Sequence, residues 1–504
     1  EDMPISNLKP LERDQFDYWK AVHLLNRAGF GGTPAQARAL ANMGLEDAVD
    51  YIVEYEEVAA PAVGADQFDK DIMRPANEEE RMEVEQARRS GNEAALEKYR
   101  QERQMRQAED RRQIGEMQKW WLKRMIETPR PLEEKMTLFW HGHFATGYRS
   151  IEDSYHMFQQ NQFLRANATG SFAELVYGIV RDPAMLRYLN NDQNRKEKPN
   201  ENLARELMEL FTLGEGNLYT ENDIKEGARA LTGFNFEDDA FVFRPQMHDT
   251  GNKTILGQKG NWDGIDFCKI ILSTRTPSEF ICWKLYRYLV SDLPGDPDKD
   301  RQAFITKWAR TFRDSNYQIK PLLKTLFKSD HFYDQANTAA LIKNPIQLIV
   351  QAIRSLHTPA RNLSALASAA DLMGQNIFFP PSVKGWDGGR AWINTSTLFV
   401  RQNLLIYLLT GRRPESYEWE ADGRDFDPIH LIAHLKEDAG EAAAQPTITD
   451  VVSYLLRFNL GAEPHDDRVK ALVEFANANG GTVDRPMLIG LLSLIAAMPE
   501  YQLC

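Results

Sequence analysis

Cysteine is scarce in this sequence. Only Cys268, Cys282 and Cys504 occur among 504 residues, and no two of them have CxxC spacing. This count argues against a disulfide framework and against a zinc site built from cysteines. A single bridge would be compatible with the sequence, but buried free thiols are the simpler expectation.

The sequence also lacks a long hydrophobic run and an excess of positive charge. No apolar run reaches the roughly 18 residues that a membrane-spanning helix needs, so no transmembrane segment is expected. The net charge of -13 argues against nucleic acid as a partner, because such binding depends on clustered lysine and arginine. The chain begins at Glu1-Asp2 without a methionine, which indicates a removed leader or a trimmed sequence.

Helical periodicity is what the sequence does contain. Apolar residues recur at core spacing through 15–53, where Thr33 and Pro34 form a helix start signal. Further predicted helices span 152–166, 171–180, 201–213, 221–232, 278–291, 301–313, 318–328, 344–356, 363–373, 396–410, 427–437, 448–458, 466–479 and 485–497. Phenylalanines and glycines in 234–260 predict one or two small β-hairpins. The expected fold class is mainly α: a large multi-helical domain with a β-hairpin insertion.

Four segments describe the expected organisation. Residues 1–60 would be N-terminal helices of the main body, 61–116 a charged helical hairpin arm, 117–412 the main helical body, and 413–504 a C-terminal helical subdomain. Within the arm, 77–114 holds many charges and few apolar residues. It is either a solvated helical surface held by i,i+4 ion pairs or an arm that contacts a partner chain.

One stretch near the middle of the chain places many polar groups beside an apolar face. Asn200 suits an N-cap and Gly214 a C′ position, so a helix is predicted between them. At about 100° per residue, its leucines share one side. Glu201, Arg205 and Glu209 form an i,i+4 ladder of alternating charge on the other side.

Glu206 is the exception in this predicted helix. It falls at the edge of the leucine face, near Leu210 and Leu213, where a carboxylate needs a partner. It either joins a metal site with histidines from elsewhere or pairs with an arginine such as Arg27 or Arg187.

His141-Gly142-His143 is a second candidate constellation. On an extended or turning segment both imidazoles would lie on one side, as a metal site requires. On a continuous helix they would lie about 200° apart and could not share an ion. Gly142 would have to end the helix between them for the metal interpretation to hold.

Two loops complete the set of candidates. His248 and Asp249 lie in a glycine-containing turn; they form either an Asx-turn with an incidental histidine, or a ligand or general base with an orienting carboxylate. The glycine-rich loop from Gly385 carries Trp386 and Trp392. These tryptophans either stack on a sugar or pack the loop onto the body.

These motifs together resemble one bacterial family, the "domain of unknown function 1800" proteins. The matching segments are His23 to Gly31, Phe139 to Phe144, Asp182 to Leu189, Asn200 to Gly214, Tyr219 to Gly233, His248 to Gly257, and Gly385-Trp386. The likeness covers roughly residues 20 to 410. It implies a protein exported to the periplasm or cell surface. It also implies a neighbouring gene for a "domain of unknown function 1501" protein of sulfatase-like or phosphatase-like fold, but it implies no reaction.

Two departures from the family pattern narrow the candidate ligands. Many members carry histidine where this chain has Phe211, and many have His-Pro where it has Arg275-Thr276-Pro277. Histidines at those places cannot be essential here. His141, His143 and His248 match the family pattern and stay candidates.

Three functions follow as hypotheses. The first is a metal-dependent hydrolase or oxidoreductase holding Zn, Fe, Mn or Cu. Its predicted ligands are His141, His143, Glu206 and His248, with Glu209 or Asp249 as an additional ligand or orienting group; Glu206, His248 and Asp249 are also its candidate catalytic residues. The second is a polysaccharide hydrolase in which Glu206 works with Glu209 or Glu201. The third is a non-catalytic surface or assembly protein whose charged arm docks the sulfatase-like partner.

Overall fold

A computed structural model describes residues 8–64, 66–292, 299–438 and 446–504 of the chain. Glu1 and Asp2, where the sequence begins, lie outside the described residues. Within them the chain is mainly helical, and its strands form two antiparallel sheets of two strands each. The predicted fold class is confirmed.

The N-terminal helices pack against one another as their periodicity predicts. They are α1 (Tyr18–Ala28), α2 (Pro34–Met43) and α3 (Leu45–Val53). The Thr33 side chain accepts a hydrogen bond from the Gln36 amide, and Gln36 reciprocates, so the predicted start of α2 is a complete capping box.

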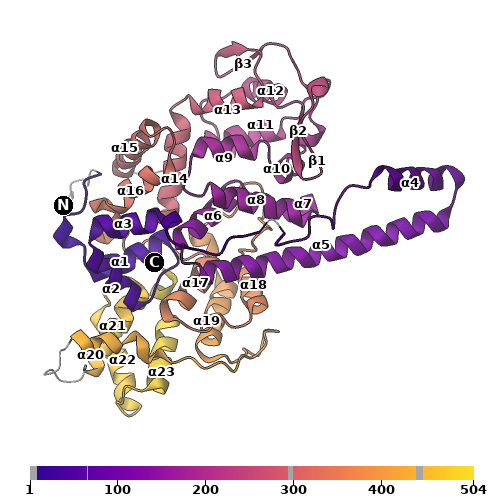
Figure 1. Cartoon of the computed structure of the whole chain (residues 1–504). Helices are drawn as coiled ribbons and strands as arrows, with labels where there is room; N and C mark the ends of the chain where they lie inside the picture. The colour runs from indigo at the N-terminus through magenta and orange to yellow at the C-terminus, as the bar shows by residue number, and fades with distance from the viewer. Residues whose placement is uncertain (1–7, 65, 293–298, 439–445) are drawn as a thin grey trace.

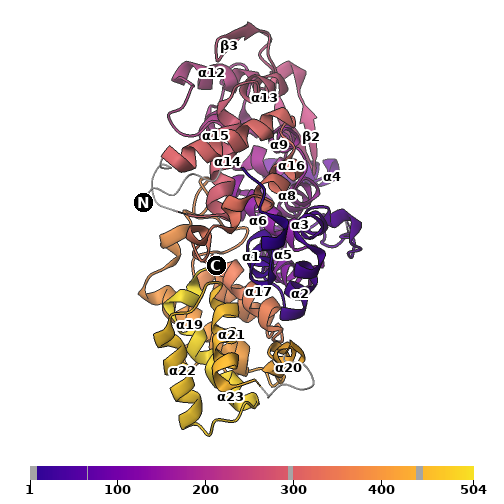
Figure 2. The same ribbon diagram turned by 90° about the vertical axis from the view of Figure 1, so that its left-hand side faces the viewer.

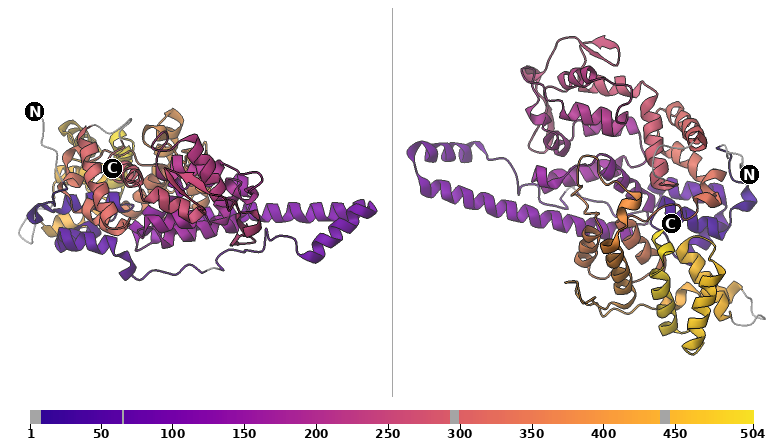
Figure 3. Two further views of the ribbon diagram at one scale, coloured as in Figure 1. Left: turned by 90° about the horizontal axis from the view of Figure 1, so that it is seen from above. Right: turned by 180° about the vertical axis from the view of Figure 1, so that it is seen from behind.

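The charged arm is a helical hairpin made of α4 (Glu78–Ser90) and α5 (Glu93–Glu127). Gly91 takes a left-handed conformation between them, with φ of 67°. Figures 1 and 3 show α5 reaching far beyond the body, with α4 folded back beside its outer end. The inner part of α5 is buried around Met117 and Trp121, so this single helix is both arm and core.

Most of the remaining helices lie within a few residues of their predicted positions, whereas the helices at 148–151, 183–188 and 264–272 were not predicted. Those of the central body are α6 (Pro131–His143), α7 (Tyr148–Ile151), α8 (Ser154–Ala166), α9 (Phe172–Ile179), α10 (Pro183–Tyr188), α11 (Asn202–Glu206), α12 (Glu221–Ala230), α13 (Gly264–Leu272), α14 (Thr276–Leu289), α15 (Lys299–Asp314), α16 (Ile319–Phe327), α17 (Pro345–Leu356), α18 (Leu363–Leu372) and α19 (Thr395–Thr410). They are followed by α20 (Ala433–Asp438), α21 (Ile448–Leu460), α22 (Asp466–Ala478) and α23 (Arg485–Ala496).

The two small sheets confirm the predicted hairpins. Strands β1 (Phe234–Glu237) and β2 (Ala240–Phe243) pair with Phe234 opposite Phe243. Strands β3 (Lys253–Ile255) and β4 (Gln258–Gly260) form the second pair. Figure 2 shows β3 at one end of an elongated molecule and the C-terminal helices at the other.

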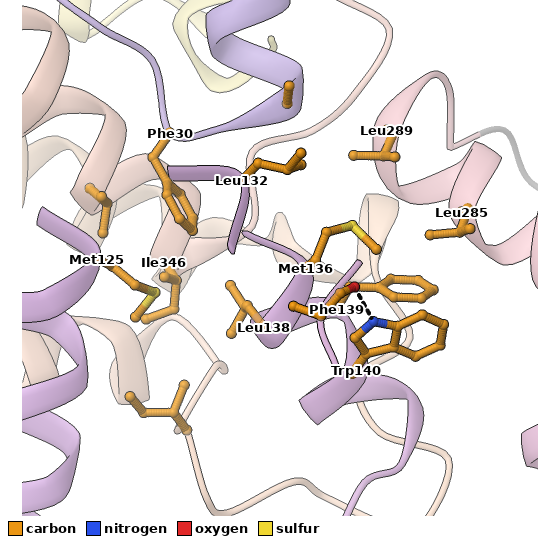
Figure 4. Packing of buried hydrophobic residues seen from close by; sticks show 14 of the residues in the cluster. Phe30, Met125, Leu132, Met136, Leu138, Phe139, Trp140, Leu285, Leu289 and Ile346 are labelled. Atoms are coloured by element: carbon orange, nitrogen blue, oxygen red, sulfur yellow. Dashed lines mark hydrogen bonds between the residues drawn. The ribbon is translucent and has the colours of Figure 1, made fainter. Parts of the chain in front are cut away.

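Helix α6 runs through the hydrophobic core. Eleven of its thirteen residues are buried, namely the ten from Leu132 to His141 and also His143. The Trp140 indole donates a 2.9 Å hydrogen bond to the Ala168 carbonyl. Figure 4 shows this core, with Leu285 of α14 and Ile346 of α17 near the α6 side chains. A helix buried on most sides can present polar groups only to a cavity or to specific partners.

The end of the sequence returns to the centre of the molecule (Figure 1). The Cys504 amide donates to the Leu341 carbonyl at 2.9 Å. Arg27 on α1 donates through Nη2 to the Cys504 main-chain oxygen at 2.7 Å.

Cys504 is buried and free, as are Cys268 and Cys282, which agrees with the simpler expectation for the cysteines. In the described ranges, no helix has both the length and the apolar character to cross a membrane.

Candidate functional site

The polar helix near the middle of the chain starts later than predicted and changes its winding. Its α-helical part, α11, begins at Asn202, because the Asn200 side chain accepts from the Asn202 amide at 3.0 Å and forms a turn ahead of the helix. The chain then continues as a π-helix, η4 (Leu207–Thr212). A π-helix has i→i+5 hydrogen bonds, so angles calculated at 100° per residue do not hold beyond Glu206.

The predicted charge ladder exists in this helix. Arg205 contacts Glu201 at 3.0 Å and Glu209 at 3.2 Å, and it also pairs with Glu221 of α12 at 2.8 Å. Glu209 is thereby engaged by an arginine. We interpret these four residues as a clamp between α11, η4 and α12.

Glu206 forms no ion pair with either arginine considered for it in the described ranges. It is half-buried, and burial followed by the nearby Glu209 carboxylate raises its pKa. Arg27 donates instead to the main-chain oxygens of Leu289, Val290, Asn337 and Cys504. In the described part of the chain, no arginine or lysine forms an ion pair with Glu206.

The two histidines of the HxH motif lie on one continuous helix and make separate contacts. Helix α6 does not end at Gly142 but runs to His143. His141 Nε2 accepts a 3.0 Å hydrogen bond from the Phe378 amide, whereas His143 Nε2 lies 3.0 Å from the Phe211 carbonyl oxygen. Gly142 therefore does not provide the break that a shared metal ion requires.

His248 and Asp249 are engaged by the loop around them. His248 Nδ1 lies 2.8 Å from the Thr232 carbonyl oxygen, and a carbonyl can only accept, so Nδ1 carries the proton. Asp249 pairs with Arg229 at 2.7 Å, and this hydrogen bond lowers the pKa of the Asp249 carboxyl. Among the residues that the structure describes, no three His, Cys, Asp or Glu side chains are grouped as a metal site would need.

A different set of residues forms a pocket of about 290 Å³ against α6. We call it the basic pocket. One stripe of α6 lines it, made of Lys135, Leu138, Phe139, Gly142 and His143. Their spacing of i, i+3, i+4, i+7 and i+8 is that of a single helix face, so this face of an otherwise buried helix opens to the pocket.

Helix α14 supplies the facing wall. Lys284, Arg287 and Tyr288 line the pocket at i, i+3 and i+4. The Tyr288 hydroxyl donates to the Lys135 carbonyl at 3.2 Å, which holds α14 to α6. The segment 341–344 and Cys504 complete the inner side.

The glycine-rich loop closes the pocket, with Trp386 and Trp392 both in its lining. A side chain at Gly385 would place its Cβ 2.2 Å from the Gly142 carbonyl oxygen, and Gly385 has φ of +76°. Glycine is therefore required for the loop to lie against α6. At Gly389 a Cβ would lie 2.6 Å from the Asp292 carboxylate, so the loop also approaches the end of α14 closely.

Four lysines line the pocket, of which the exposed Lys384 pairs with Glu215 at 3.4 Å. The other three give the pocket its character. Lys135 and Lys343 are 4% and 2% exposed, whereas Lys284 is partly accessible. Burial lowers the pKa of each to about 8; for Lys135 and Lys343, the charge of Cys504 acts in the opposite direction. In the described ranges none of these ammonium groups forms an ion pair with an aspartate or glutamate. Arg287 is paired with Asp292 at 2.6 Å.

Neutral groups hold the two buried lysines. Lys135 Nζ donates to the Gln347 side chain and lies 5.0 Å from the centre of the Tyr288 ring. Lys343 Nζ donates to the Tyr501 carbonyl at 2.8 Å and lies 4.2 Å from the centre of the Tyr501 ring. Aromatic faces attract cations without neutralising them, so the pocket keeps an excess of positive charge.

His143 and Lys284 form a polar pair inside the pocket. Because the Phe211 carbonyl must accept the proton from His143 Nε2, Nδ1 of that ring is unprotonated. Nδ1 lies 3.2 Å from Lys284 Nζ and accepts from it. Burial, and next the Lys284 charge, lower the pKa of His143, so this imidazole is neutral at physiological pH.

Comparison with known proteins gives the family. A family model described as "Protein of unknown function (DUF1800)" matches residues 23–503. The chain belongs to this family. Its membership confirms the resemblance carried by the motifs and extends it beyond residue 410 to nearly the whole chain. No curated protein and no solved structure matches the chain.

Sequence reasoning found His143, Trp386 and Trp392 of the pocket but missed its lysines. A signal was present on α6, where Lys135 and His143 stand two turns apart on one face with Phe139 between them. Lysines at 284 and 343 read as ordinary surface residues. Only the fold brings them to the same cavity.

Proposed function

We propose that the basic pocket binds a small anionic ligand that carries a carboxylate, sulfate or phosphate group. The observation that carries the proposal is the placement of Lys135, Lys284 and Lys343 around one cavity without an ion pair to an aspartate or glutamate in the described ranges. Burying an unpaired charge is costly, and an anion in the cavity would offset that cost.

The size of the pocket limits the ligand. Small-molecule sites commonly occupy about 300–1,000 Å³, and this pocket of about 290 Å³ lies at the lower end. At pH 7 a lysine with a pKa of about 8 is mostly charged. The expected ligand is therefore compact, with its charged group directed at the lysines and an apolar part near Phe139 or Trp386.

Calorimetric titration with inorganic phosphate and sodium sulfate at low ionic strength tests the proposal. Saturable binding is expected for the full chain. Lys284→Met should weaken it by about tenfold or more, since a hydrogen bond to a charged group contributes about 1.5–3 kcal/mol.

Lys253→Met is the matched control for this experiment. Lys253 is also fully buried, but it donates to the carbonyls of Asp249 and Gly251 in another part of the fold. Binding should persist in this variant. Equal loss in both variants, or no saturable binding of either anion, would overturn the proposal.

The metal-dependent hydrolase or oxidoreductase predicted from the sequence is a separate proposal. Elemental analysis of the purified protein tests it. Stoichiometric Zn, Fe, Mn or Cu that is lost in His141→Ala and Glu206→Ala would support it. Retention of the metal in both variants would overturn the predicted ligand set.

Export to the periplasm or cell surface is likewise a proposal, carried by family membership.

The projecting arm supports a second candidate function, docking of a partner protein. The α4–α5 hairpin extends from the body and exposes Met82 and Met105, at 60% and 63%, among its charges. A sulfatase-like partner of the "domain of unknown function 1501" family is the proposed occupant. Co-purification of that protein with the full chain, and its loss when the arm is removed, would support docking; co-purification that survives removal would contradict it.

A further inference from the structure

We infer that the ligand of the basic pocket is a hexuronic acid, a sugar whose carboxylate lies at the N-terminus of α17 and whose hydroxyl groups donate to Asp387. This inference rests on the proposed function and names the class of ligand. Four side chains of the pocket that the lysines leave without a role carry it, namely Asn344, Gln375, Trp386 and Asp387.

Two amide side chains of the pocket cap the start of α17. Asn344 Oδ1 accepts from the Gln347 amide at 2.8 Å, and Gln375 Oε1 accepts from the Ile346 amide at 3.0 Å. A main-chain amide can only donate, so these bonds fix which end of each side chain is the oxygen. Within the described ranges, neither Gln375 Nε2 nor Asn344 Nδ2 donates to a protein group, although Gln375 is only 5% exposed. Both NH2 groups are therefore available to an acceptor on a ligand.

The same helix start gathers positive charge. Lys343 directly precedes Asn344, and Lys135 donates to the side chain of Gln347 in the first turn of α17. The N-terminus of a helix also carries partial positive charge from its aligned peptide groups. Cations, amide donors and the helix N-terminus thus share one part of the pocket. We place the carboxylate of the ligand there.

Asp387 adds an acceptor that a simple inorganic anion would not need. This residue of the glycine-rich loop lines the pocket, is exposed, and forms no ion pair in the part of the chain that the structure describes. A carboxylate repels a second anion but accepts hydrogen bonds from hydroxyl groups. The pocket therefore suits a molecule that carries hydroxyl groups as well as an acidic group.

Trp386 offers a surface for the ring of such a molecule. Its indole is partly exposed and lies against α6 at Gly142, where a Cβ would be 3.9 Å from Trp386 Cε3. The face of an aromatic ring is electron-rich and attracts C–H groups, which a sugar ring presents on its faces. A pocket of about 290 Å³ is at the lower end for a ligand site. A single ring with a carboxylate, the smallest of the three acidic groups, fits it best.

Calorimetric titration of the full chain with three ring compounds tests the inference. Glucuronate has both the carboxylate and the hydroxyl groups, glucose lacks the carboxylate, and cyclohexanecarboxylate lacks the hydroxyl groups. Glucuronate should bind at least about tenfold more tightly than either of the others. If sulfate binds but glucuronate binds no more tightly than cyclohexanecarboxylate, the hexuronic acid is overturned while the proposed function stands.

Asp387→Asn separates recognition of the sugar from damage to the fold. The hydroxyl groups lose a charged acceptor, so glucuronate binding should weaken by about tenfold. Sulfate binding should stay equal or become tighter, because the variant removes a negative charge from the pocket. Unchanged glucuronate binding, or equal weakening of both ligands, would overturn the inference.

Gln375→Glu tests the amide donors at the start of α17. The substituted side chain can still accept from the Ile346 amide, but it places negative charge where the carboxylate of the ligand should lie. Glucuronate binding should fall at least about tenfold. Asn92→Asp is the matched control, because it makes the same change at the N-cap of α5, where Asn92 accepts from the Ala95 amide at 3.2 Å. Equal binding of glucuronate by these two variants would overturn the placement of its carboxylate.

Discussion

Single residues in this protein carry charge in places where water is largely excluded. Lys135 and Lys343 lie in the interior with aromatic rings and amide oxygens as neighbours. Glu134 is fully buried as well, but two arginines surround it. The two kinds of site have different consequences: loss of the Glu134 carboxylate would leave buried arginines uncompensated, whereas the unpaired ammonium groups are available to a ligand.

Sulfate binding should depend on pH in the range set by the lysines. Their pKa values of about 8 mean that the cations are present below pH 8 and are lost as the pH rises through it. Sulfate does not titrate in this range. Calorimetry between pH 6.5 and 9.5 should show an affinity that falls above pH 8. A constant affinity up to pH 9.5 would mean that ordinary lysines bind the anion.

Glu134→Gln should destabilise the protein. Arg165 contacts the Glu134 carboxylate at 2.8 and 3.0 Å, the Trp121 indole donates to it at 2.8 Å, and Arg124 pairs with it. Breaking a buried ion pair typically costs about 3–5 kcal/mol. A clearly lower midpoint of thermal denaturation is expected.

The exposed pair of Glu116 and Lys119 supplies the control for that variant. Glu116→Gln should leave the midpoint nearly unchanged, because exposed pairs contribute about 0–1 kcal/mol. The arginines lower the pKa of Glu134 although burial alone would raise it. The contribution of Glu134 to the free energy of unfolding should therefore be present at neutral pH and lost as the pH falls through the acidic range. Similar midpoints for the two variants would contradict this account.

At the scale of elements, α6 is the organising helix. It places one face in the core and another along the basic pocket, while α14 and the glycine-rich loop supply the opposing walls. Its start at Pro131 and its apolar periodicity are local signals in the sequence. The π-helical turn in η4 was not predicted, since i→i+5 winding is set by packing around a helix rather than by a residue preference.

Gly385→Ala should disturb the pocket through the loop alone. A Cβ at this position would approach the Gly142 carbonyl to 2.2 Å, and the backbone has φ of +76°. The loop must move away from α6, which should weaken sulfate binding by about tenfold, or about 1.4 kcal/mol. Calorimetry measures the change.

Gly216→Ala separates backbone strain from steric contact. Gly216 has the same φ of +76°, but a Cβ there would meet nothing within 4 Å. This variant should bind sulfate as the wild type does, with only the stability cost of a strained backbone. Equal effects on binding in the two variants would contradict a role for the contact between the loop and α6.

At the scale of the whole molecule, distant segments of the chain meet at one centre. Arg27 near the beginning of the chain donates to main-chain oxygens of Leu289, Asn337 and Cys504. The basic pocket lies beside this junction and includes Cys504 in its lining. The arm, in contrast, leaves the body, and hydrogen bonds among Arg74, Glu80 and Arg106 join its segments to one another.

Replacing residues 76–104 with a short glycine–serine linker should leave the body folded. Arg106 Nη1 lies 3.4 Å from the Arg74 carbonyl oxygen, so the two ends of the deletion are close together. The thermal midpoint and sulfate binding should stay near those of the full chain, because the core contacts of α5 begin near Asp110 and Ile114. A large fall in either quantity would show that the arm stabilises the body.

The sequence by itself determined most of the helices, the hairpins, the charged arm and the family, because caps, periodicity and motif order are contained within short stretches of chain. Tertiary structure decided the candidate site. Lys135, Lys284 and Lys343 are separated by more than fifty residues from one another, and nothing local marks Lys284 or Lys343 as residues of a cavity. The same packing engages His248 with Thr232 and Asp249 with Arg229. Burial and charge proximity belong to the folded chain, and they convert three ordinary lysines into a cationic pocket.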